Sequence, residues 1–143
     1  MAKKEIIGYT TGVYDLFHIG HLNLLKNAKA QCDKLIVGVT TDELAQYKNK
    51  KPFIPLKERI AIIEAIKYVD KVVIQDDLDK LKAWHKYHYD ILFVGSDWQG
   101  TETWKNYEKY LEKVGAKVVY LEYTKHTSST ILQDVLKKFL ETH

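Results

Sequence analysis

Five short apolar runs, rich in β-branched residues, alternate along the chain with segments of helical periodicity. They predict strands at residues 5–11, 34–40, 71–74, 91–94 and 117–121. The second, fourth and fifth runs are almost continuously apolar, which is typical of strands buried on both faces of a sheet. The pattern predicts one α/β domain, residues 1–143, whose five-stranded, mainly parallel sheet is doubly wound with helices on both faces. Ligands of such folds bind beyond the carboxyl ends of the strands.

Start and stop signals predict the helices between these strands. They are expected from Leu22 onward, after Pro55, at residues 78–87 and 102–113, and from Ser129 or Thr130 onward. The last helix carries an apolar stripe of Ile131, Leu132, Val135, Leu136 and Phe139. No internal repeat or low-complexity segment interrupts this order, and the one long loop, residues 47–55, is rich in lysine.

Composition narrows the functional classes. A single cysteine, Cys32, rules out an intramolecular disulfide framework. The apolar runs are too short to cross a bilayer, and the first residues do not resemble a signal peptide, so we expect a cytoplasmic protein without a membrane partner. A net charge of +3 is too small to indicate nucleic acid, but it suits an anionic small molecule if the excess charge is focused in one cleft.

The segment after the first strand carries the candidate chemistry. Gly12 follows the strand at a point where the backbone must turn or approach a ligand closely. His18 and His21 are three residues apart at the start of a helix and share one face, and Gly20 leaves room beside them. Free N–H groups at the helix N-terminus add to this arrangement, which suits a phosphate chain. A metal site or a purely structural histidine pair are the alternatives.

The segment Gly12-Val-Tyr-Asp-Leu-Phe-His-Ile-Gly-His21 strongly resembles the HxGH signature of the nucleotidyltransferase superfamily. Gly95-Ser-Asp97-Trp98 resembles the Gly-x-Asp-Trp segment of cytidylyltransferases, and residues 124–130 resemble the Arg-Thr-Glu-Gly-Ile-Ser-Thr-Thr motif of that branch. Residues 64–70 are similar to the helix-to-strand passage of the same proteins. The resemblance covers nearly the whole chain, implies a Rossmann-like domain, and is greatest to the glycerol-3-phosphate cytidylyltransferases.

This resemblance implies that a phosphomonoester oxygen attacks the α-phosphorus of CTP and expels pyrophosphate. The second pKa of a phosphomonoester is about 6, so the nucleophile is already mostly dianionic and needs no general base. The favoured acceptor is sn-glycerol 3-phosphate, which would give CDP-glycerol, a precursor of teichoic acid or capsule polymers. Phosphocholine or phosphoethanolamine as acceptor, an adenylyltransferase of the same fold, and a nucleotide-binding regulatory module without turnover are the alternatives.

The resemblance also implies roles for individual residues. The catalytic set is His18, His21 and Lys48. The expected nucleotide-binding residues are Gly12, Val13, Tyr14, Gly20, Asp97, Trp98, Thr124, Ser128, Ser129 and Thr130. The expected substrate-binding residues are Asp15, Lys50, Arg59 and Lys67, of which Arg59 is the only arginine in the chain. We expect Mg²⁺ as cofactor, held mainly by CTP phosphates and without a dedicated protein site, and a homodimer as the assembly.

Some positions depart from the pattern of these cytidylyltransferases. Tyr123 stands where their motif has arginine, and Lys125 and His126 replace the glutamate and glycine that follow. Lys67 also stands in place of an arginine, and Val13 in place of a threonine. Bidentate donation to phosphate is lost at both arginine positions, so the substitutions bear on the rate, on the acceptor and, to a lesser degree, on the nucleotide, but not on the superfamily.

Overall fold

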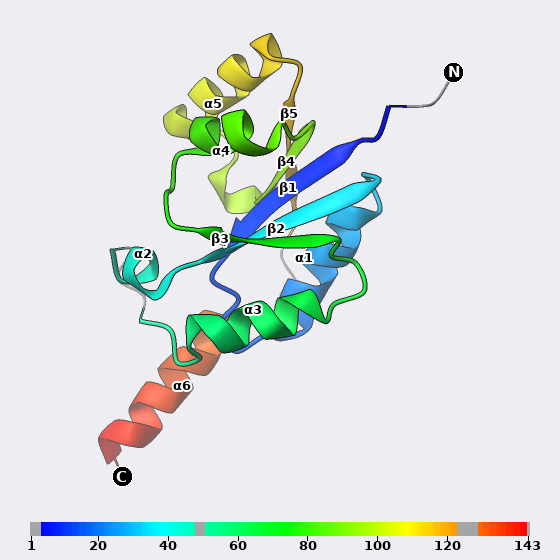
Figure 1. The fold of residues 1–143 in the computed structure, drawn as a ribbon. Coiled ribbons are helices and arrows are strands. Elements are labelled where there is room, and N and C mark those ends of the chain that lie inside the picture. Colours follow the sequence, from blue (N-terminus) through cyan, green and yellow to red (C-terminus); the bar gives the residue numbers. More distant parts are fainter. Residues whose placement is uncertain (1–3, 48–50, 123–128, 143) are drawn as a thin grey trace.

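The computed structural model describes residues 4–47, 51–122 and 129–142. Its core is one sheet of five parallel strands in the order β3-β2-β1-β4-β5 (Figure 1). The strands are β1 Ile7–Gly12, β2 Lys34–Thr40, β3 Lys71–Gln75, β4 Ile91–Gly95 and β5 Lys117–Leu121. The expected strands are therefore confirmed to within a few residues, and the sheet is entirely rather than mainly parallel.

Helices cover both faces of this sheet. Leu25 of α1 and Ile63 of α3 join one core cluster with Val37 of β2, whereas Trp104 of α5 belongs to a second cluster with Tyr9 of β1. The helices are α1 Ile19–Lys29, α2 Asp42–Tyr47, α3 Leu56–Glu64, α4 Lys80–Tyr87, α5 Glu102–Lys113 and α6 Ser129–Thr142. None of the helices in the described ranges is long and apolar enough to cross a membrane.

Two helix boundaries differ from the sequence expectation, and one further helix was not expected. Helix α1 begins at Ile19 instead of Leu22, because the His18 side chain caps it. Helix α4 begins at Lys80, since the Asp79 side chain accepts a hydrogen bond from the backbone N–H of Leu81 at 2.9 Å. The short helix α2 lies where the sequence pattern predicted no helix.

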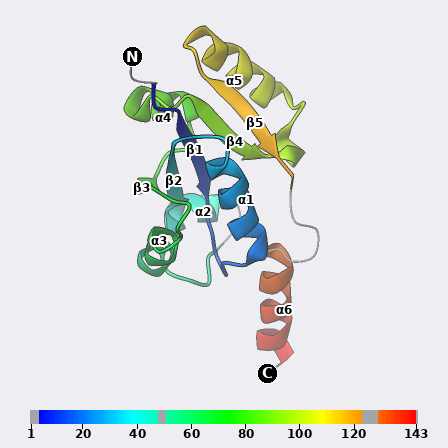
Figure 2. The same ribbon diagram turned by 90° about the vertical axis from the view of Figure 1, so that its right-hand side faces the viewer.

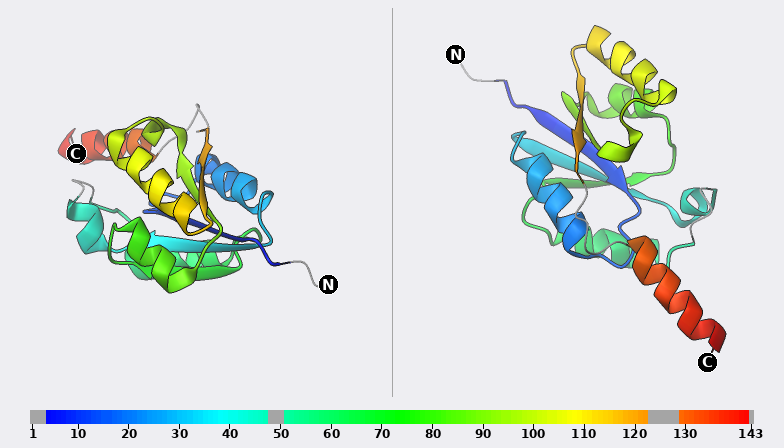
Figure 3. Two further views of the ribbon diagram at one scale, coloured as in Figure 1. Left: turned by 90° about the horizontal axis from the view of Figure 1, so that it is seen from above. Right: turned by 180° about the vertical axis from the view of Figure 1, so that it is seen from behind.

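The strand order creates one switch point. The chain builds β1, β2 and β3 outward in one direction, and then returns to place β4 on the other side of β1. The carboxyl ends of β1 and β4 therefore flank the crevice where parallel α/β sheets bind ligands. We call the side of the sheet where the strands end the carboxyl edge, and the opposite side the amino edge. Helix α6 extends beyond the rest of the molecule, with the C-terminus at its tip (Figures 2 and 3).

Candidate active site

The turn after β1 is built from residues in an uncommon backbone conformation. Tyr14 and Leu16 have φ angles of 54° and 50°, in the left-handed region that non-glycine residues rarely adopt. Tyr14 is 7% exposed, and its ring packs so closely on Gly12 that a Cβ there would lie 2.9 Å from the ring. Glycine at position 12 thus makes room for a side chain of the protein, and Tyr14, expected to bind nucleotide, belongs to the core cluster.

The two histidines close a capping box at the start of α1. The Nδ1 atom of His18 accepts a hydrogen bond from the backbone N–H of Gly20 at 3.0 Å. The Nδ1 atom of His21 accepts one from the backbone N–H of His18 at 3.3 Å. The ring centroids of the two histidines are 4.1 Å apart. Serine and glutamate usually fill these two capping positions, so here the imidazoles satisfy helix donors and still have a second ring nitrogen each.

These contacts determine the proton positions on both rings. Burial lowers the pKa of His18, and burial together with the neighbouring His18 lowers the pKa of His21 to about 4, against a smaller opposing effect of Asp15. Both rings are therefore neutral at pH 7. Because each Nδ1 accepts a hydrogen bond, each neutral ring carries its proton on Nε2. The pair thus presents two Nε2–H donors.

One of these donors has no hydrogen-bond partner within the described part of the chain. The Nε2 atom of His18 is buried and has no hydrogen-bond partner among the residues that the structure describes. A buried donor without an acceptor costs free energy of the order of 1–3 kcal/mol. A phosphate oxygen in the crevice would satisfy it, next to the backbone N–H groups of the α1 N-terminus.

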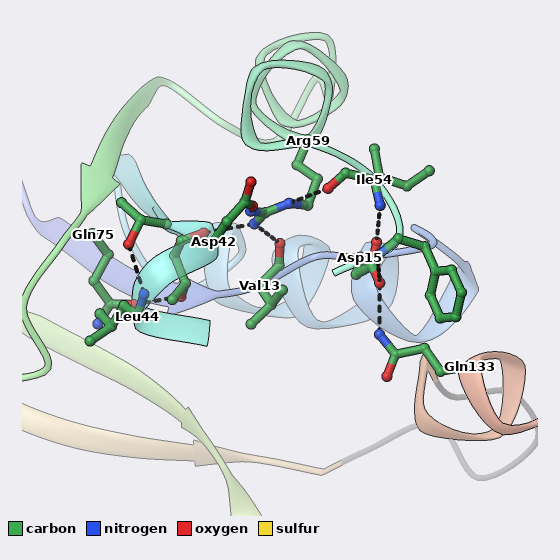
Figure 4. A network of polar contacts seen from close by, with 11 residues as sticks. Val13, Asp15, Asp42, Leu44, Ile54, Arg59, Gln75 and Gln133 are labelled. Atoms are coloured by element: carbon green, nitrogen blue, oxygen red, sulfur yellow. Dashed lines mark hydrogen bonds and ion pairs between the residues drawn. The ribbon is translucent and has the colours of Figure 1, made fainter. Parts of the chain in front are cut away.

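Asp15 ties three segments of the chain together (Figure 4). Its carboxylate is 1% exposed and accepts hydrogen bonds from the backbone N–H groups of Phe53 and Ile54, each at 2.9 Å. It also accepts a hydrogen bond from Nε2 of Gln133 on α6, at 2.6 Å. The expected substrate residue Asp15 therefore holds the end of the lysine-rich loop and α6 against the histidine-bearing turn.

Arg59, like Asp15, makes its polar contacts with other parts of the protein (Figure 4). This side chain on α3 is fully buried, and its guanidinium forms an ion pair with Asp42. It donates to the backbone carbonyls of Ile54, Val13 and Thr40 at 2.8, 2.8 and 2.7 Å. This differs from the expected contact with substrate: the planar fork of the single arginine joins the turn after β1 to the end of β2 and the loop before α3.

The segment after β4, which follows the other strand at the switch point, is exposed to solvent. Asp97 and Trp98 form a short 3₁₀ helix, η1 Ser96–Trp98, directly after β4. Both side chains are exposed, and Trp98 is 51% exposed. The structure thus places these two expected nucleotide residues at the carboxyl end of β4, the strand that pairs with β1, which leads into the histidine turn.

Several expected residues are not brought to this edge or lie outside the described residues. Lys67 follows α3 and lies three residues before Asp70, at the amino edge, where its Nζ is 5.2 Å from the centroid of the Tyr68 ring. That position separates it from the histidine pair, contrary to the expectation that it binds substrate. Ser129 and Thr130 begin α6, but their side chains are not described. Outside the described residues lie Lys48, Lys50, Tyr123, Thr124, Lys125, His126 and Ser128.

One cation at the carboxyl edge was not among the residues expected from the sequence. Lys80 begins α4, and its Nζ donates to Oγ1 of Thr11 near the end of β1, at 2.8 Å. The signal was available, because Asp79 and Lys80 follow the third strand and the carboxyl ends of parallel strands meet at one edge. Among the described residues, no group of three or more histidine, cysteine or acidic side chains could hold a metal ion.

The all-parallel sheet, its switch point and the histidine pair at a helix N-terminus define a nucleotide-handling α/β protein of Rossmann-like fold. The family model described as "Cytidylyltransferase-like" matches residues 9–135. The chain therefore belongs to the cytidylyltransferase-like family and is a nucleotidyltransferase.

Individual relatives agree with this assignment. The glycerol-3-phosphate cytidylyltransferase of Staphylococcus aureus is 34% identical over 93% of this chain and 95% of its own length. An FAD synthase of Archaeoglobus fulgidus is 31% identical over 90% of this chain and 96% of its own. The crystal structure of the lipopolysaccharide core biosynthesis protein of Thermoplasma volcanium matches with a TM-score of 0.72 and 29% identity, covering 87% of this chain and all of that one.

Proposed function

We propose that this protein transfers CMP from CTP to sn-glycerol 3-phosphate, producing CDP-glycerol and pyrophosphate. The observation that carries the proposal is the buried Nε2–H of His18 beside the N-terminus of α1, which has no acceptor among the described residues and can donate to a triphosphate. The relative from Staphylococcus aureus named glycerol-3-phosphate cytidylyltransferase supports this choice of nucleotide and acceptor.

The reaction requires positioning and charge stabilisation more than proton transfer. An oxygen of the acceptor phosphate forms a bond to the α-phosphorus of CTP, and the bond from that phosphorus to the bridging oxygen of pyrophosphate breaks. The attacking phosphate is mostly dianionic at neutral pH, because its second pKa is about 6. Catalysis then consists of aligning the two phosphates and stabilising charge on the transferred group and leaving group.

In this proposal the histidine pair stabilises the transferring phosphoryl group. The Nε2–H groups of His18 and His21 donate to its oxygens, and the capping bonds at the two Nδ1 atoms keep both rings oriented. A donor of this kind, already oriented in a site that excludes water, typically contributes a factor of about 10²–10³ to kcat. The low pKa of His21, about 4, keeps that ring neutral before the nucleotide binds.

The remaining residues supply binding. We infer that Lys48 contacts the phosphates as the third catalytic residue and Lys50 the acceptor, and that Asp97 and Trp98 border the nucleoside. The further nucleotide contacts in this proposal are Gly12, Val13, Gly20, Thr124, Ser128, Ser129 and Thr130, whereas Tyr14 packs in the core. MgCTP is the substrate form: Asp15 is hydrogen-bonded on both oxygens, so Mg²⁺ would be held by phosphate oxygens and water. The proposal also includes a cytoplasmic homodimer that supplies teichoic acid or capsule synthesis.

A second candidate is adenylyl transfer to a flavin phosphate. The FAD synthase of Archaeoglobus fulgidus is 31% identical over almost the same span, and it favours this alternative. The histidine pair suits either reaction, because its donors address phosphate and not the base. The choice between them therefore depends on the open side of the crevice around Asp97 and Trp98.

The test is a panel of nucleotides crossed with acceptors. Purified protein with Mg²⁺ is given CTP, ATP, UTP or GTP together with glycerol 3-phosphate, phosphocholine, phosphoethanolamine or FMN, and pyrophosphate release is measured. We expect the fastest release with CTP and glycerol 3-phosphate. Faster release with ATP and FMN would overturn the proposal in favour of the flavin reaction. Binding of CTP without release for any acceptor would indicate a regulatory nucleotide-binding protein.

A further inference from the structure

Helix α6 meets the body of the protein through a polar contact near its start. Among residues 131–141 only Leu132 and Gln133 are half-buried, and the others are exposed. Val135 is 60% exposed and Phe139 56%, so apolar packing does little to fix the position of this helix. The hydrogen bond from Gln133 to Asp15 is therefore a main determinant of where α6 lies.

This hydrogen bond belongs to the strong, charge-assisted kind (Figure 4). Nε2 of Gln133 donates to Oδ2 of Asp15 at 2.6 Å, and the Asp15 side chain is 1% exposed. Water cannot easily take the place of a donor to a buried carboxylate, so the loss of this donor costs more than the loss of an exposed one. Gln133 thus stabilises both the charge of Asp15 and the attachment of α6.

The same carboxylate connects α6 to the loop before α3. Its Oδ2 accepts from Gln133 and from the backbone N–H of Phe53, and its Oδ1 accepts from the backbone N–H of Ile54. Asp15 itself lies in the turn that leads to His18. One buried group therefore holds together α6, the end of the lysine-rich loop and the histidine-bearing turn.

We propose that Gln133 is a positioning residue, which holds the first turn of α6 beside the histidine-bearing turn so that this part of the helix can contact the nucleotide. Ser129 and Thr130 begin α6 and precede Gln133 by about one turn, so a bond that fixes residue 133 also fixes the backbone of that turn. The inference rests on the proposed function, in which Ser129 and Thr130 contact the nucleotide. Gln133 acts through Asp15 and does not itself touch the reacting atoms.

Three replacements of Gln133 separate its donor from its shape. Methionine, lysine and glutamate have similar helix propensities to glutamine and side chains of comparable reach. Gln133→Met removes the donor, Gln133→Lys keeps one, and Gln133→Glu places a second carboxylate against Asp15. If the hydrogen bond positions α6, lysine should preserve the attachment of the helix, methionine should weaken it, and glutamate should weaken it most. If packing alone mattered, methionine would be tolerated best.

The first test is amide hydrogen exchange of the full chain without ligand, which does not depend on the identity of the substrates. We expect the backbone amides of residues 133–136 to exchange about tenfold faster in Gln133→Met and at nearly the wild-type rate in Gln133→Lys. Gln31→Met is the matched control, because Nε2 of Gln31 donates to the carbonyl of Asn27, at 3.3 Å, near the amino edge. Unchanged exchange in Gln133→Met, or an equal change in Gln31→Met, would overturn the proposal.

The second test measures pyrophosphate release with CTP and glycerol 3-phosphate. Gln133→Met should raise KM for CTP about tenfold, because a nucleotide contact is loosened, and should change kcat and KM for glycerol 3-phosphate by less than about threefold. Gln133→Lys should restore the wild-type KM for CTP. A variant that was only less stable would lower the amount of active enzyme and leave both KM values unchanged. Faster exchange in α6 with an unchanged KM for CTP would therefore show a structural role alone and overturn the proposal.

Failure of this inference and failure of the proposed function give different results. If the wild-type protein prefers ATP and FMN, the proposed function is wrong, and the KM for ATP then tests the role of Gln133 in the same way. If no acceptor supports turnover, the dissociation constant of the nucleotide, measured by calorimetry, replaces KM. If CTP and glycerol 3-phosphate react well and Gln133→Met changes neither exchange nor KM, only the role of Gln133 is refuted.

Discussion

The two edges of the sheet use their polar groups differently. At the amino edge, Asp33, Asp70 and Asp90 each precede a strand and accept a hydrogen bond from a backbone N–H at the start of a neighbouring strand, at 2.7, 2.8 and 2.9 Å. These carboxylates satisfy donors that the ladder leaves open where the strands begin. At the amino edge these three carboxylates thus bond to the protein itself and stabilise the fold.

At the carboxyl edge the backbone is strained and a donor is left over. Tyr14 and Leu16 have positive φ angles, and the Nε2–H of His18 has no partner among the described residues. Strained residues and unsatisfied buried groups persist only where the surrounding contacts hold them, and they cluster at functional sites. Asp15 and Arg59 supply those contacts here. We therefore infer that the polar groups of the amino edge stabilise the fold, whereas those of the carboxyl edge bind the ligand.

Arg59→Met should have the largest effect on stability, because it removes the hydrogen bonds and the ion pair that connect the segments of the carboxyl edge. The substitution leaves the carbonyls of Val13, Thr40 and Ile54 without their donor and the Asp42 carboxylate without its cation. We expect the free energy of unfolding to fall by about 3–5 kcal/mol in urea denaturation. A loss below about 1 kcal/mol would show that the turn holds its conformation without this network.

Replacing His18 with asparagine, His18→Asn, separates the capping role of this residue from its proposed catalytic role at the carboxyl edge. Asparagine is a good N-cap and should keep the hydrogen bond to the Gly20 N–H, but it lacks a donor where His18 has Nε2–H. We expect kcat to fall by about 10²–10³ while the free energy of unfolding does not fall, because the cap is kept and the unsatisfied donor is removed. His18→Ala is the control that loses both functions, so it should also lose about 1 kcal/mol of stability. An asparagine variant with wild-type kcat would refute the catalytic role.

The dependence of protein stability on pH should report the protonation of His21 at the carboxyl edge. The pKa of His21 is about 4 in the folded protein, mainly through burial, against an ordinary value of 6.5. The unfolded chain therefore binds more protons between these values, and the folded state loses stability as the pH falls from 6.5 towards 4. The loss amounts to up to about 3 kcal/mol. Urea midpoints measured with and without His21→Asn test this, and equal slopes for both proteins would contradict it.

Asp70→Ala should give the smallest effect and the opposite phenotype. Asp70 accepts from the backbone N–H of Leu35 and from Nζ of Lys29, at the amino edge. Removing it should cost about 1–2 kcal/mol of unfolding free energy and leave kcat/KM for pyrophosphate release unchanged. If this variant lost activity without losing stability, the division of roles between the two edges would be wrong.

The sequence predicts the fold well because its signals are local. Apolar runs predict the strands, capping signals predict the helices, and parallel crossovers then predict the edge where the ligand binds. The histidine pair could be found as well, since both residues lie on one turn of one helix. The capping of α4 by Asp79 was identified only from the structure, although a carboxylate just before a helix is a common capping signal.

The partners of Asp15 and Arg59 could not be predicted in the same way. Asp15 meets Phe53 and Gln133, which are 38 and 118 residues away along the chain, and periodicity carries no information about such pairs. The position of Lys67 could not be predicted either. The family resemblance implied contact with substrate, but the residue lies at the amino edge. Contacts of high sequence separation are set by the packing of whole elements and not by local propensity.

The central claim is that the histidine pair meets the nucleotide as neutral Nε2–H donors, and ¹⁵N NMR of the histidine rings tests it most directly. At pH 7 both rings should show protonated Nε2 and unprotonated Nδ1. Addition of MgCTP should shift the Nε2–H resonance of His18 strongly, because its proton then gains a phosphate acceptor. A ring of His18 protonated on Nδ1, or an Nε2–H signal unchanged at saturating MgCTP, would contradict the account.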